Sequence, residues 1–228
     1  MADAATIPDI GQIIAAVGAL GAAAYGLVDA TKAFGGGVSL RGLHYVDSAL
    51  KPFDVALAKA VGGNWRDVVK AHWINGRPKA EQKAIAKALI RLGLDSDSAG
   101  ELAKAGGVDG TRLKDVAEKL AVGNELSAQD LNLLGRFDAT VDAKLDAAFE
   151  RADQSYRNSA KCWAAVVSVV LAVTGSTVVG TNGFDWSNIS LAILIGLLAV
   201  PLAPVAKDVS SALSAAVSAM QIAKGRKS

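Results

Sequence analysis

Long apolar stretches without any charged residue alternate with amphipathic segments along this chain of 228 residues. Three stretches contain no Asp, Glu, Lys or Arg: Ile10–Val28, Cys162–Phe184 and Trp186–Ala206. At about 1.5 Å rise per residue they correspond to helices of roughly 28, 34 and 31 Å. The hydrocarbon core of a bilayer is about 30 Å thick, so each is long enough to cross it. The pattern predicts three transmembrane helices.

The first stretch is the least hydrophobic, because ten of its nineteen residues are Ala or Gly. Two alternatives therefore stay open for it, a cleaved signal peptide and a buried helix of a soluble protein. A signal peptide begins with basic residues, whereas the segment before Ile10 has Asp3 and Asp9 and no Lys or Arg. We expect a membrane span here too.

The central region, residues 29–161, carries most of the charge, with 20 of the 24 Lys and Arg and 18 of the 22 Asp and Glu residues. Residues 94–110 are rich in Gly and small polar residues and are predicted to be mostly loop. Apolar periodicity and turn residues around them predict short amphipathic helices. These cover Ser39–Val61 with a break near Pro52, Trp65–Ile74, the segment from Pro78 to Leu92, and Thr111–Val122.

A much longer helix is predicted after this set. Ser127 and Asp130 have the spacing of a capping box, and no proline follows until Pro201. Positions 138, 141, 145, 148, 152, 156, 159 and 163 follow a 3,4 repeat, as in a helix with one packed seam. The sequence therefore predicts one continuous helix from Asp130 to Val179, running out of the central region into the second span.

Positive charge in the flanks predicts the orientation, because Lys and Arg stay on the cytoplasmic side. The N-terminal flank and the loop of residues 181–188 contain no basic residue. Basic residues lie in the other flanks: Lys32, Arg41, Arg151, Arg157, Lys161, Lys207, Lys224, Arg226 and Lys227. The expected topology is N-terminus outside and C-terminus inside, with Lys161, Trp163, Trp186 and Lys207 at the membrane interfaces.

Two rows of residues suggest contacts. Gly18, Ala22 and Gly26 recur every four residues in the first span, where small side chains let helices approach closely in lipid. We expect this row to pack on another span, of this chain or of a second copy. The second row is Lys79, Lys83, Lys87 and Arg91 on the helix after Pro78. It is expected to be a solvated face, and contact with anionic headgroups is the alternative.

Candidate chemistry is sparse. We find no catalytic, cofactor-binding or metal-ligating constellation: His44 and His72 have no partner at ligand spacing, and the single cysteine, Cys162, lies at a predicted membrane edge. A net charge of +2 does not predict a nucleic-acid surface. No charge lies inside a span, so an ion-coupled carrier is not indicated. Hydroxyl groups in the second span, such as Ser168, Thr174 and Thr177, could line a pore or bond to their own helix carbonyls.

Three short segments resemble those of an uncharacterised family of bacterial inner-membrane proteins with one N-terminal span, a helical cytoplasmic region and a C-terminal hairpin of two spans. The first is Val38–Leu43 after the first span. The second, before the second span, is Phe149–Arg151 with Tyr156 and Arg157, where Ser155 replaces the family's Trp. The third is Pro204 with Asp208, followed by Gly225–Lys227. The resemblance implies the same topology in a bacterial inner membrane, and it gives no indication of an activity.

The expected molecule is an all-α integral membrane protein. It has a short outer N-terminus (1–9), the first span (10–28), a helical cytoplasmic domain (29–161), a hairpin of two spans (162–206) and a cytoplasmic amphipathic C-terminal helix (207–228). The hypothesis for its function is a non-enzymatic membrane anchor or scaffold, without a cofactor, that self-associates or docks a cytoplasmic protein. The alternative is a pore-forming or membrane-disrupting effector gated by its cytoplasmic domain.

Overall fold

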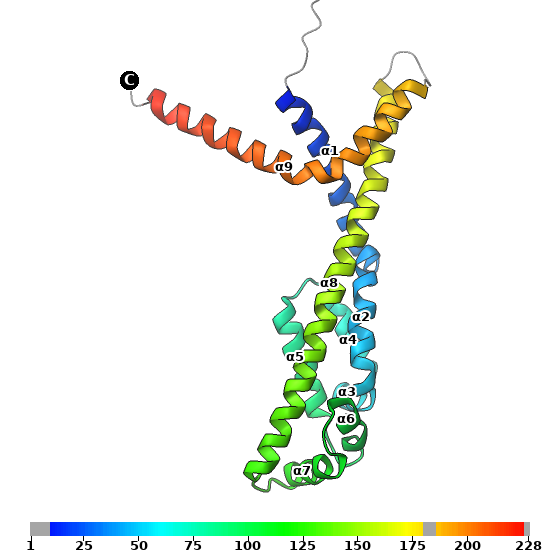
Figure 1. Ribbon diagram of the computed structural model, residues 1–228, viewed down its shortest axis with the longest axis vertical. Helices are drawn as coiled ribbons and strands as arrows, with labels where there is room; N and C mark the ends of the chain where they lie inside the picture. The colour runs from blue at the N-terminus through cyan, green and yellow to red at the C-terminus, as the bar shows by residue number, and fades with distance from the viewer. Residues whose placement is uncertain (1–9, 180–185, 226–228) are drawn as a thin grey trace, which may run out of the picture. The chain divides into compact units, whose positions relative to one another are not determined.

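The computed structural model describes residues 10–179 and 186–225, and their side chains for 10–178 and 186–205. Within these ranges the regular secondary structure is entirely helical (Figure 1). The elements are α1 (Ile10–Ala30), η1 (Thr31–Ala33), η2 (Gly37–Ser39), α2 (Leu40–Leu50), η3 (Lys51–Phe53), α3 (Asp54–Val61), α4 (Trp65–Ile74), α5 (Lys79–Leu92), α6 (Ala99–Gly106), α7 (Gly110–Val122), α8 (Ala128–Val179) and α9 (Trp186–Gly225).

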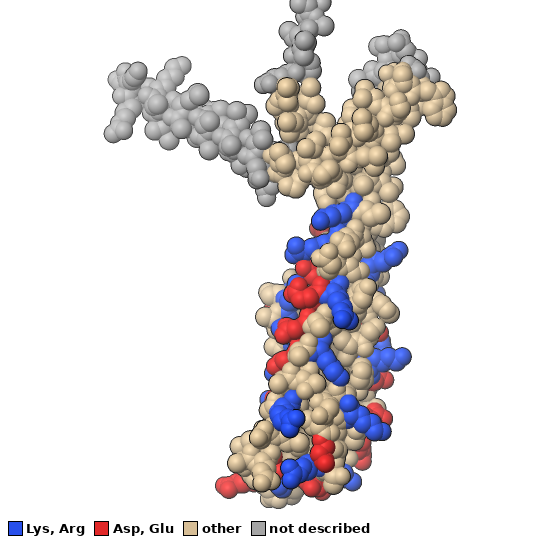
Figure 2. Space-filling view, viewed as in Figure 1, with Lys and Arg blue, Asp and Glu red and all other residues tan. Residues whose placement is uncertain are grey.

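The chain divides into two compact units. The apolar unit comprises Met1–Val38 and Asn158–Ser228, and the charged unit comprises Ser39–Arg157. Figure 2 shows the difference in surface: acidic and basic side chains are interspersed over the charged unit, whereas the described helices of the apolar unit are almost free of them. Three of the described helices, α1, α8 and α9, are long and apolar enough to cross a membrane. The all-helical class and these three helices agree with the sequence prediction.

The charged unit is built around one core. Helices α2 to α8 contribute side chains that are almost completely removed from solvent, the largest being Trp65, Phe53 and Phe137. Trp65 also donates from Nε1 to Asp54 Oδ1 at 2.6 Å, so its one polar atom is satisfied. Burying apolar surface contributes about 25 cal/mol per Å². This core gives the charged unit its own source of stability.

Local sequence signals define the ends of these helices. Asn64 caps α4 by accepting from Arg66 N, and Asp109 caps α7 by accepting from Arg112 N at 2.9 Å. The predicted capping box is present: Asp130 N donates to Ser127 Oγ at 3.2 Å, and Ser127 N donates to Asp130 Oδ2 at 3.0 Å. Such reciprocal bonds satisfy backbone donors that a helix start leaves free.

Helix α6 corrects the prediction of a mostly irregular segment at residues 94–110. Asp95 Oδ1 accepts from the backbone N–H groups of Asp97 and Ser98, which shapes the turn that begins the helix. The small residues that favoured a loop are instead required for close packing, since a Cβ on Gly106 would lie 2.3 Å from the Phe137 ring. Ala and Gly therefore mark tight helix packing here rather than irregular chain.

Helix α8 is continuous over 52 residues, from Ala128 to Val179. Its first part supplies Phe137, Val141 and Leu145 to the core of the charged unit, and its last part belongs to the apolar unit. The expected continuity between Arg151 and Lys161 is confirmed. One continuous helix is therefore shared between the two units.

In the apolar unit, α1 packs against α9 and α8 packs against α9 at positions without large side chains. A Cβ on Gly21 would lie 2.1 Å from the carbonyl oxygen of Ala199. A Cβ on Gly196 would lie 2.5 Å from Val169 Cα on α8. In both places only glycine allows the backbones to approach so closely.

The third span and the C-terminal helix were predicted as separate elements, but the structure has one helix, α9, of 40 residues. Pro201 and Pro204 lie inside it. A proline within a helix removes a hydrogen bond and clashes with the carbonyl four residues earlier, so it bends the helix rather than always ending it. Figure 1 shows α9 changing direction part-way along its length.

Candidate functional site

The most extensive polar feature among the described residues is a ladder of ion pairs between α5 and α8. Its basic residues belong to the row predicted on α5, and its acidic residues belong to α8. Lys87 Nζ lies 2.6 Å from Asp142 Oδ2, and Lys83 pairs with Asp146. The rungs at the two ends are Arg91 with Asp138 at 2.5 Å, and Lys79 with Glu150 and Asp153 at 3.1 and 3.2 Å.

The ladder aligns the two helices in opposite directions. The basic residues advance by four along α5, while their partners step back by four along α8, from Asp146 to Asp142 to Asp138. Residues four apart lie on one helix face, so two straight rows of opposite charge meet. This arrangement favours an antiparallel over a parallel pairing of α5 with α8.

The pKa shifts at the end of the ladder follow from these bonds. The carboxylate of Glu150 accepts from Lys79 and raises the pKa of that lysine, with Asp153 adding to the effect. Partial burial works against ionisation of Asp153, but hydrogen bonds from Lys79 and Arg157 outweigh it and lower its pKa. Both directions favour the charged forms at neutral pH.

The ladder changes the interpretation of the basic row. Lys79, Lys83, Lys87 and Arg91 were expected to be solvated cations or to contact lipid headgroups, and each has a carboxylate partner on α8. Headgroup contact stays an untested prediction. A signal for the ladder was present in the sequence, since acidic residues recur at positions 138, 142, 146 and 150 with the same spacing as the basic row.

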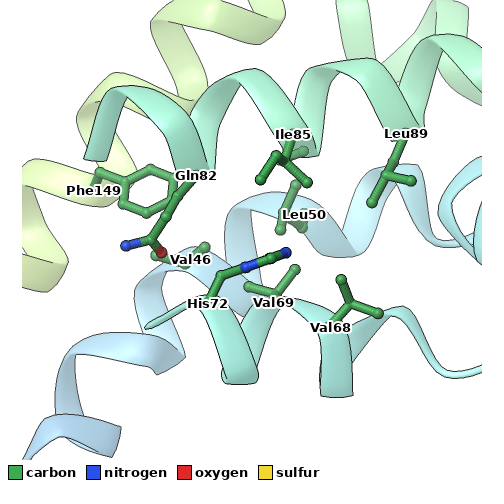
Figure 3. A pocket seen from close by; sticks show the side chains of 10 residues that line it. Val46, Leu50, Val68, Val69, His72, Gln82, Ile85, Leu89 and Phe149 are labelled. Carbon is green, nitrogen blue, oxygen red and sulfur yellow. The ribbon is translucent and has the colours of Figure 1, made fainter. Parts of the chain in front are cut away.

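A small cleft opens between α4 and α5 (Figure 3). Its floor is formed by Val46 and Leu50 of α2, with Phe149 of α8 at one end. Its polar lining consists of His72 and Gln82. Its volume is about 10 Å³, close to the minimum of roughly 10–15 Å³ that one water molecule needs. The cleft in this form has no room for a cofactor.

Gln82 is the most buried polar residue of this cleft, with 7 % of its surface exposed. Its Nε2 donates to Arg77 O at 2.6 Å, which fixes the amide orientation. Its Oε1 has no hydrogen-bond partner among the described residues. Among those residues there is also no cluster of three His, Cys, Asp or Glu side chains able to hold a metal ion.

The hydroxyl groups of the second span bond to backbone carbonyls. Thr174 Oγ1 donates to Val170 O at 2.8 Å, and Thr177 Oγ1 donates to Thr174 O at 2.9 Å. Of the two alternatives left open by the sequence, bonding within the helix is the one observed. Ser168 differs, because its fully buried Oγ contacts Gly196 O of α9 at 2.6 Å as well as Ala165 O.

The predicted packing row on α1 divides between two faces. Gly18 is buried, whereas Ala22 and Gly26 are exposed, and a Cβ on Gly26 would meet nothing within 4 Å. The buried row includes Gly21 and Ala24, a face adjacent to the predicted one. The expected contact of Ala22 and Gly26 within the chain is therefore not made, and contact with a second copy stays a prediction.

The residues predicted at the membrane interfaces lie on the surface of the single chain where they are described. Lys161 is exposed, and Trp163 and Trp186 are 50 % and 76 % exposed. The side chain of Lys207 lies outside the described residues. Exposed indole rings near the ends of apolar helices suit the headgroup region, where an amphipathic ring is favoured.

Comparisons with protein families, with curated proteins and with solved structures found no match to this chain.

Proposed function

We propose that this protein is a non-enzymatic anchor or scaffold of a bacterial inner membrane that self-associates or docks a cytoplasmic protein. The observation that carries the proposal is the continuity of α8 over 52 residues, from the core of the charged unit into an apolar stretch. The unbroken helix connects the folded charged unit to the apolar stretch without an intervening loop. An anchor needs such a link between a folded domain and its span.

The surface of the apolar unit supports insertion in a membrane. Large apolar side chains on α8 and α9 are about half exposed, including Val166, Val170, Leu194 and Leu197. Soluble proteins rarely expose contiguous apolar patches larger than a few hundred Å². In the proposed topology the charged unit and the C-terminus lie in the cytoplasm and the N-terminus lies outside, in agreement with the distribution of Lys and Arg.

A pore-forming effector is the competing function. Ser168 is buried and donates to Gly196 O of α9, while Thr174 and Thr177 are exposed and donate to carbonyl oxygens of their own helix. The competing function therefore draws no support from them.

Reconstitution in liposomes tests the proposal. The purified chain is inserted into vesicles that hold a trapped dye and a potassium gradient. A scaffold leaves both intact, whereas release of either at low protein-to-lipid ratio identifies a pore. Size measurement in mild detergent provides the second readout. A chain that is monomeric there, and that recovers no partner by crosslinking in native membranes, is not a scaffold.

A further inference from the structure

The apolar unit contains an open groove that is lined by all three of its long helices. Its volume is about 380 Å³, within the range of roughly 300–1,000 Å³ that small-molecule sites occupy. Leu20 of α1 and Ala172 and Ser176 of α8 line it, together with one face of α9 between Asn188 and Ile195. All of these side chains belong to the apolar unit.

Short side chains between larger ones produce the groove. Ala192 lies on the lining face of α9 and is 4 % exposed, and Ala172 contributes an equally short side chain from α8. Leu20 directly precedes Gly21, where α1 and α9 are in close contact through Ala199. The groove therefore lies beside the point at which α1 meets α9.

Polarity changes along the groove. Its two polar residues, Ser176 and Asn188, are the lining residues nearest along the chain to the segment that joins α8 to α9, and the others are Leu, Ile and Ala. Asn188 follows Trp186, which is predicted at the membrane interface, by two residues. From Asn188 to Ile195 a helix rises about 10 Å. The groove is thus expected to begin at the depth of the lipid headgroups and to continue into the hydrocarbon core.

The polar end of the groove offers hydrogen-bond donors. Asn188 is exposed, and its side chain forms no hydrogen bond with another described residue. Its amide group carries two donor hydrogens and one acceptor oxygen. Ser176 Oγ already donates to Val173 O at 2.8 Å. The free donors of Asn188 are suited to the ester and phosphate oxygens of a phospholipid, which can only accept.

The apolar part of the groove is suited to an acyl chain. Water finds no hydrogen-bond partners along apolar walls, and an empty space in contact with lipid loses dispersion contacts. Leu191 lines the groove and is also 56 % exposed. The groove is therefore continuous with the exposed apolar surface of α9, which in the proposed anchor faces the lipid.

We propose that this groove binds one phospholipid of the surrounding membrane. Part of an acyl chain lies along Leu20, Ala192 and Ile195, and the ester or phosphate oxygens accept from the amide of Asn188. This inference rests on the proposed membrane insertion. It adds to the anchor a lipid that is held at a defined place between α1 and the pair of α8 and α9.

Native mass spectrometry tests the site on the full-length chain, released from nanodiscs of phosphatidylethanolamine and phosphatidylglycerol. One phospholipid should stay bound at collision energies that remove the other lipids. Ala192→Trp fills the groove and should reduce the bound fraction several-fold. Leu194→Trp is the matched control, because Leu194 is exposed on the same helix and does not line the groove.

Three outcomes overturn the inference. The first is an unmodified chain that retains no lipid, and the second is equal retention in the two tryptophan variants. The third is a dimer that retains no lipid, which means that a second copy covers the groove.

A second pair of variants tests the polar contact at exposed positions, where the fold tolerates substitution. Asn188→Leu keeps the apolar groove and removes the amide, so its bound fraction should fall below that of Ser190→Leu. Ser190 is the control because its hydroxyl donates to Ser187 O and it does not line the groove. Equal retention in the two leucine variants refutes the contact between Asn188 and the lipid.

Resistance of the chain to carbonate extraction separates this inference from the proposed function. If the chain stays in the membrane but retains no phospholipid, the lipid site is wrong and the anchor is unaffected. If carbonate removes the chain, the spans are not inserted and both proposals fail.

Discussion

At the scale of single residues, glycine positions control how closely the helices of the apolar unit approach each other. Gly21 of α1 faces the Ala199 carbonyl so closely that any side chain would clash, while the space beside Gly26 is open. Both glycines lie in the same helix, and only Gly26 belongs to the row that the sequence predicted to pack. Only the partner helix distinguishes them.

We predict that Gly21→Leu destabilises the apolar unit and that Gly26→Leu does not. Forcing side-chain atoms into a close contact costs about 1–3 kcal/mol. Thermal unfolding in mild detergent should therefore begin at lower temperature for Gly21→Leu than for the unmodified chain. Equal stability of the two variants contradicts the α1–α9 packing. A loss of self-association in Gly26→Leu alone supports a second copy on that face.

Two carboxylates give the charged unit a defined acid sensitivity. A hydrogen bond from Lys59, supported by the backbone of Ser98, lowers the pKa of Asp95 to about 2, and Lys119 with Ser127 lowers the pKa of Asp130 to about 2. The usual value is 3.8. The pKa of each carboxyl is lower in the folded than in the unfolded state. The contribution of the two ionised carboxylates to folding stability is therefore complete above pH 3.8 and disappears as the pH falls toward 2.

The expected result is a fall in unfolding temperature of the charged unit across that acidic interval, measured by circular dichroism at a series of pH values. Asp130→Asn should keep an oxygen acceptor for the cap but lose the ion pair with Lys119. Its melting temperature should therefore depend less on pH below 3.8 than that of the unmodified chain. An unchanged slope argues against the ion pair.

At the scale of elements, the ladder between α5 and α8 combines weak interactions into a directional one. An exposed ion pair typically contributes 0.2–1 kcal/mol, and networks contribute more reliably than single pairs. The ladder lies beside a core to which α5 contributes Ile90 and α8 contributes Val141 and Leu145. Burial supplies most of the free energy, and the charges select the antiparallel arrangement.

Exchanging the two charges at one rung of the ladder tests whether Lys87 and Asp142 interact directly. Lys87→Glu places two acidic groups together and Asp142→Lys two basic groups, so each alone should destabilise the charged unit. The double variant restores opposite charges and should recover most of the loss, with a coupling energy of about 1 kcal/mol in a double-mutant cycle. The measurement is urea unfolding, repeated at high salt, where screening should reduce the coupling. Additive single effects contradict a direct pair.

A proline that interrupts α8 between the two units tests whether the continuous helix connects them rigidly. Ala152 lies near the end of the charged unit but is unsuitable for this test, because it is fully buried and a Cβ on Gly42 would lie 2.5 Å from its carbonyl oxygen. A substitution there would also damage the core. Asn158 is exposed at the unit boundary and is the better position.

Asn158→Pro removes a helix hydrogen bond and costs about 3 kcal/mol or more, whereas Asn158→Ala keeps the helix. Distances between spin labels on the two parts of α8 should be narrowly distributed in the alanine variant and broad in the proline variant. Both variants should keep the melting transition of the charged unit. Equally broad distributions indicate that α8 is not a rigid connection in solution.

At the scale of the whole molecule, the topology decides which surfaces can meet a partner. Single cysteines in a Cys162→Ser background test it with an impermeant thiol reagent on intact cells. Ser98 is unsuitable for a label, because it is completely buried and its hydroxyl donates to Gly93 O. One cysteine therefore replaces Glu125, which is exposed, and the other replaces Asn182, in the loop that the sequence predicts at residues 181–188.

The proposed orientation predicts reaction at position 182 in intact cells and at position 125 only after the membrane is opened. Denaturing detergent provides the control that both thiols can react. Labelling from outside at position 125 but not at position 182 reverses the proposed orientation. Labelling at both positions from outside places residues 29–161 on the outer side together with the loop.

The sequence by itself determined the features that depend on local chemistry. Apolar stretches of sufficient length, the capping box of Ser127 with Asp130, and the start of α5 after Pro78 all follow from neighbours along the chain. For the same reason the unbroken course of α8 could be predicted. Periodicity and capping act within a few residues, so a single sequence contains them completely.

Tertiary structure decided the questions that depend on a second element. On α1, several rows of Ala and Gly are equivalent by sequence, and the Ala199 backbone selected the one with Gly21. The segment of α6 became a helix because its small residues fit against Phe137. The basic row on α5 was visible in sequence, but its role depended on acidic residues 47 to 74 positions away. Such contacts depend on the helix faces that the fold brings together. The spacing of residues along one helix does not specify those faces.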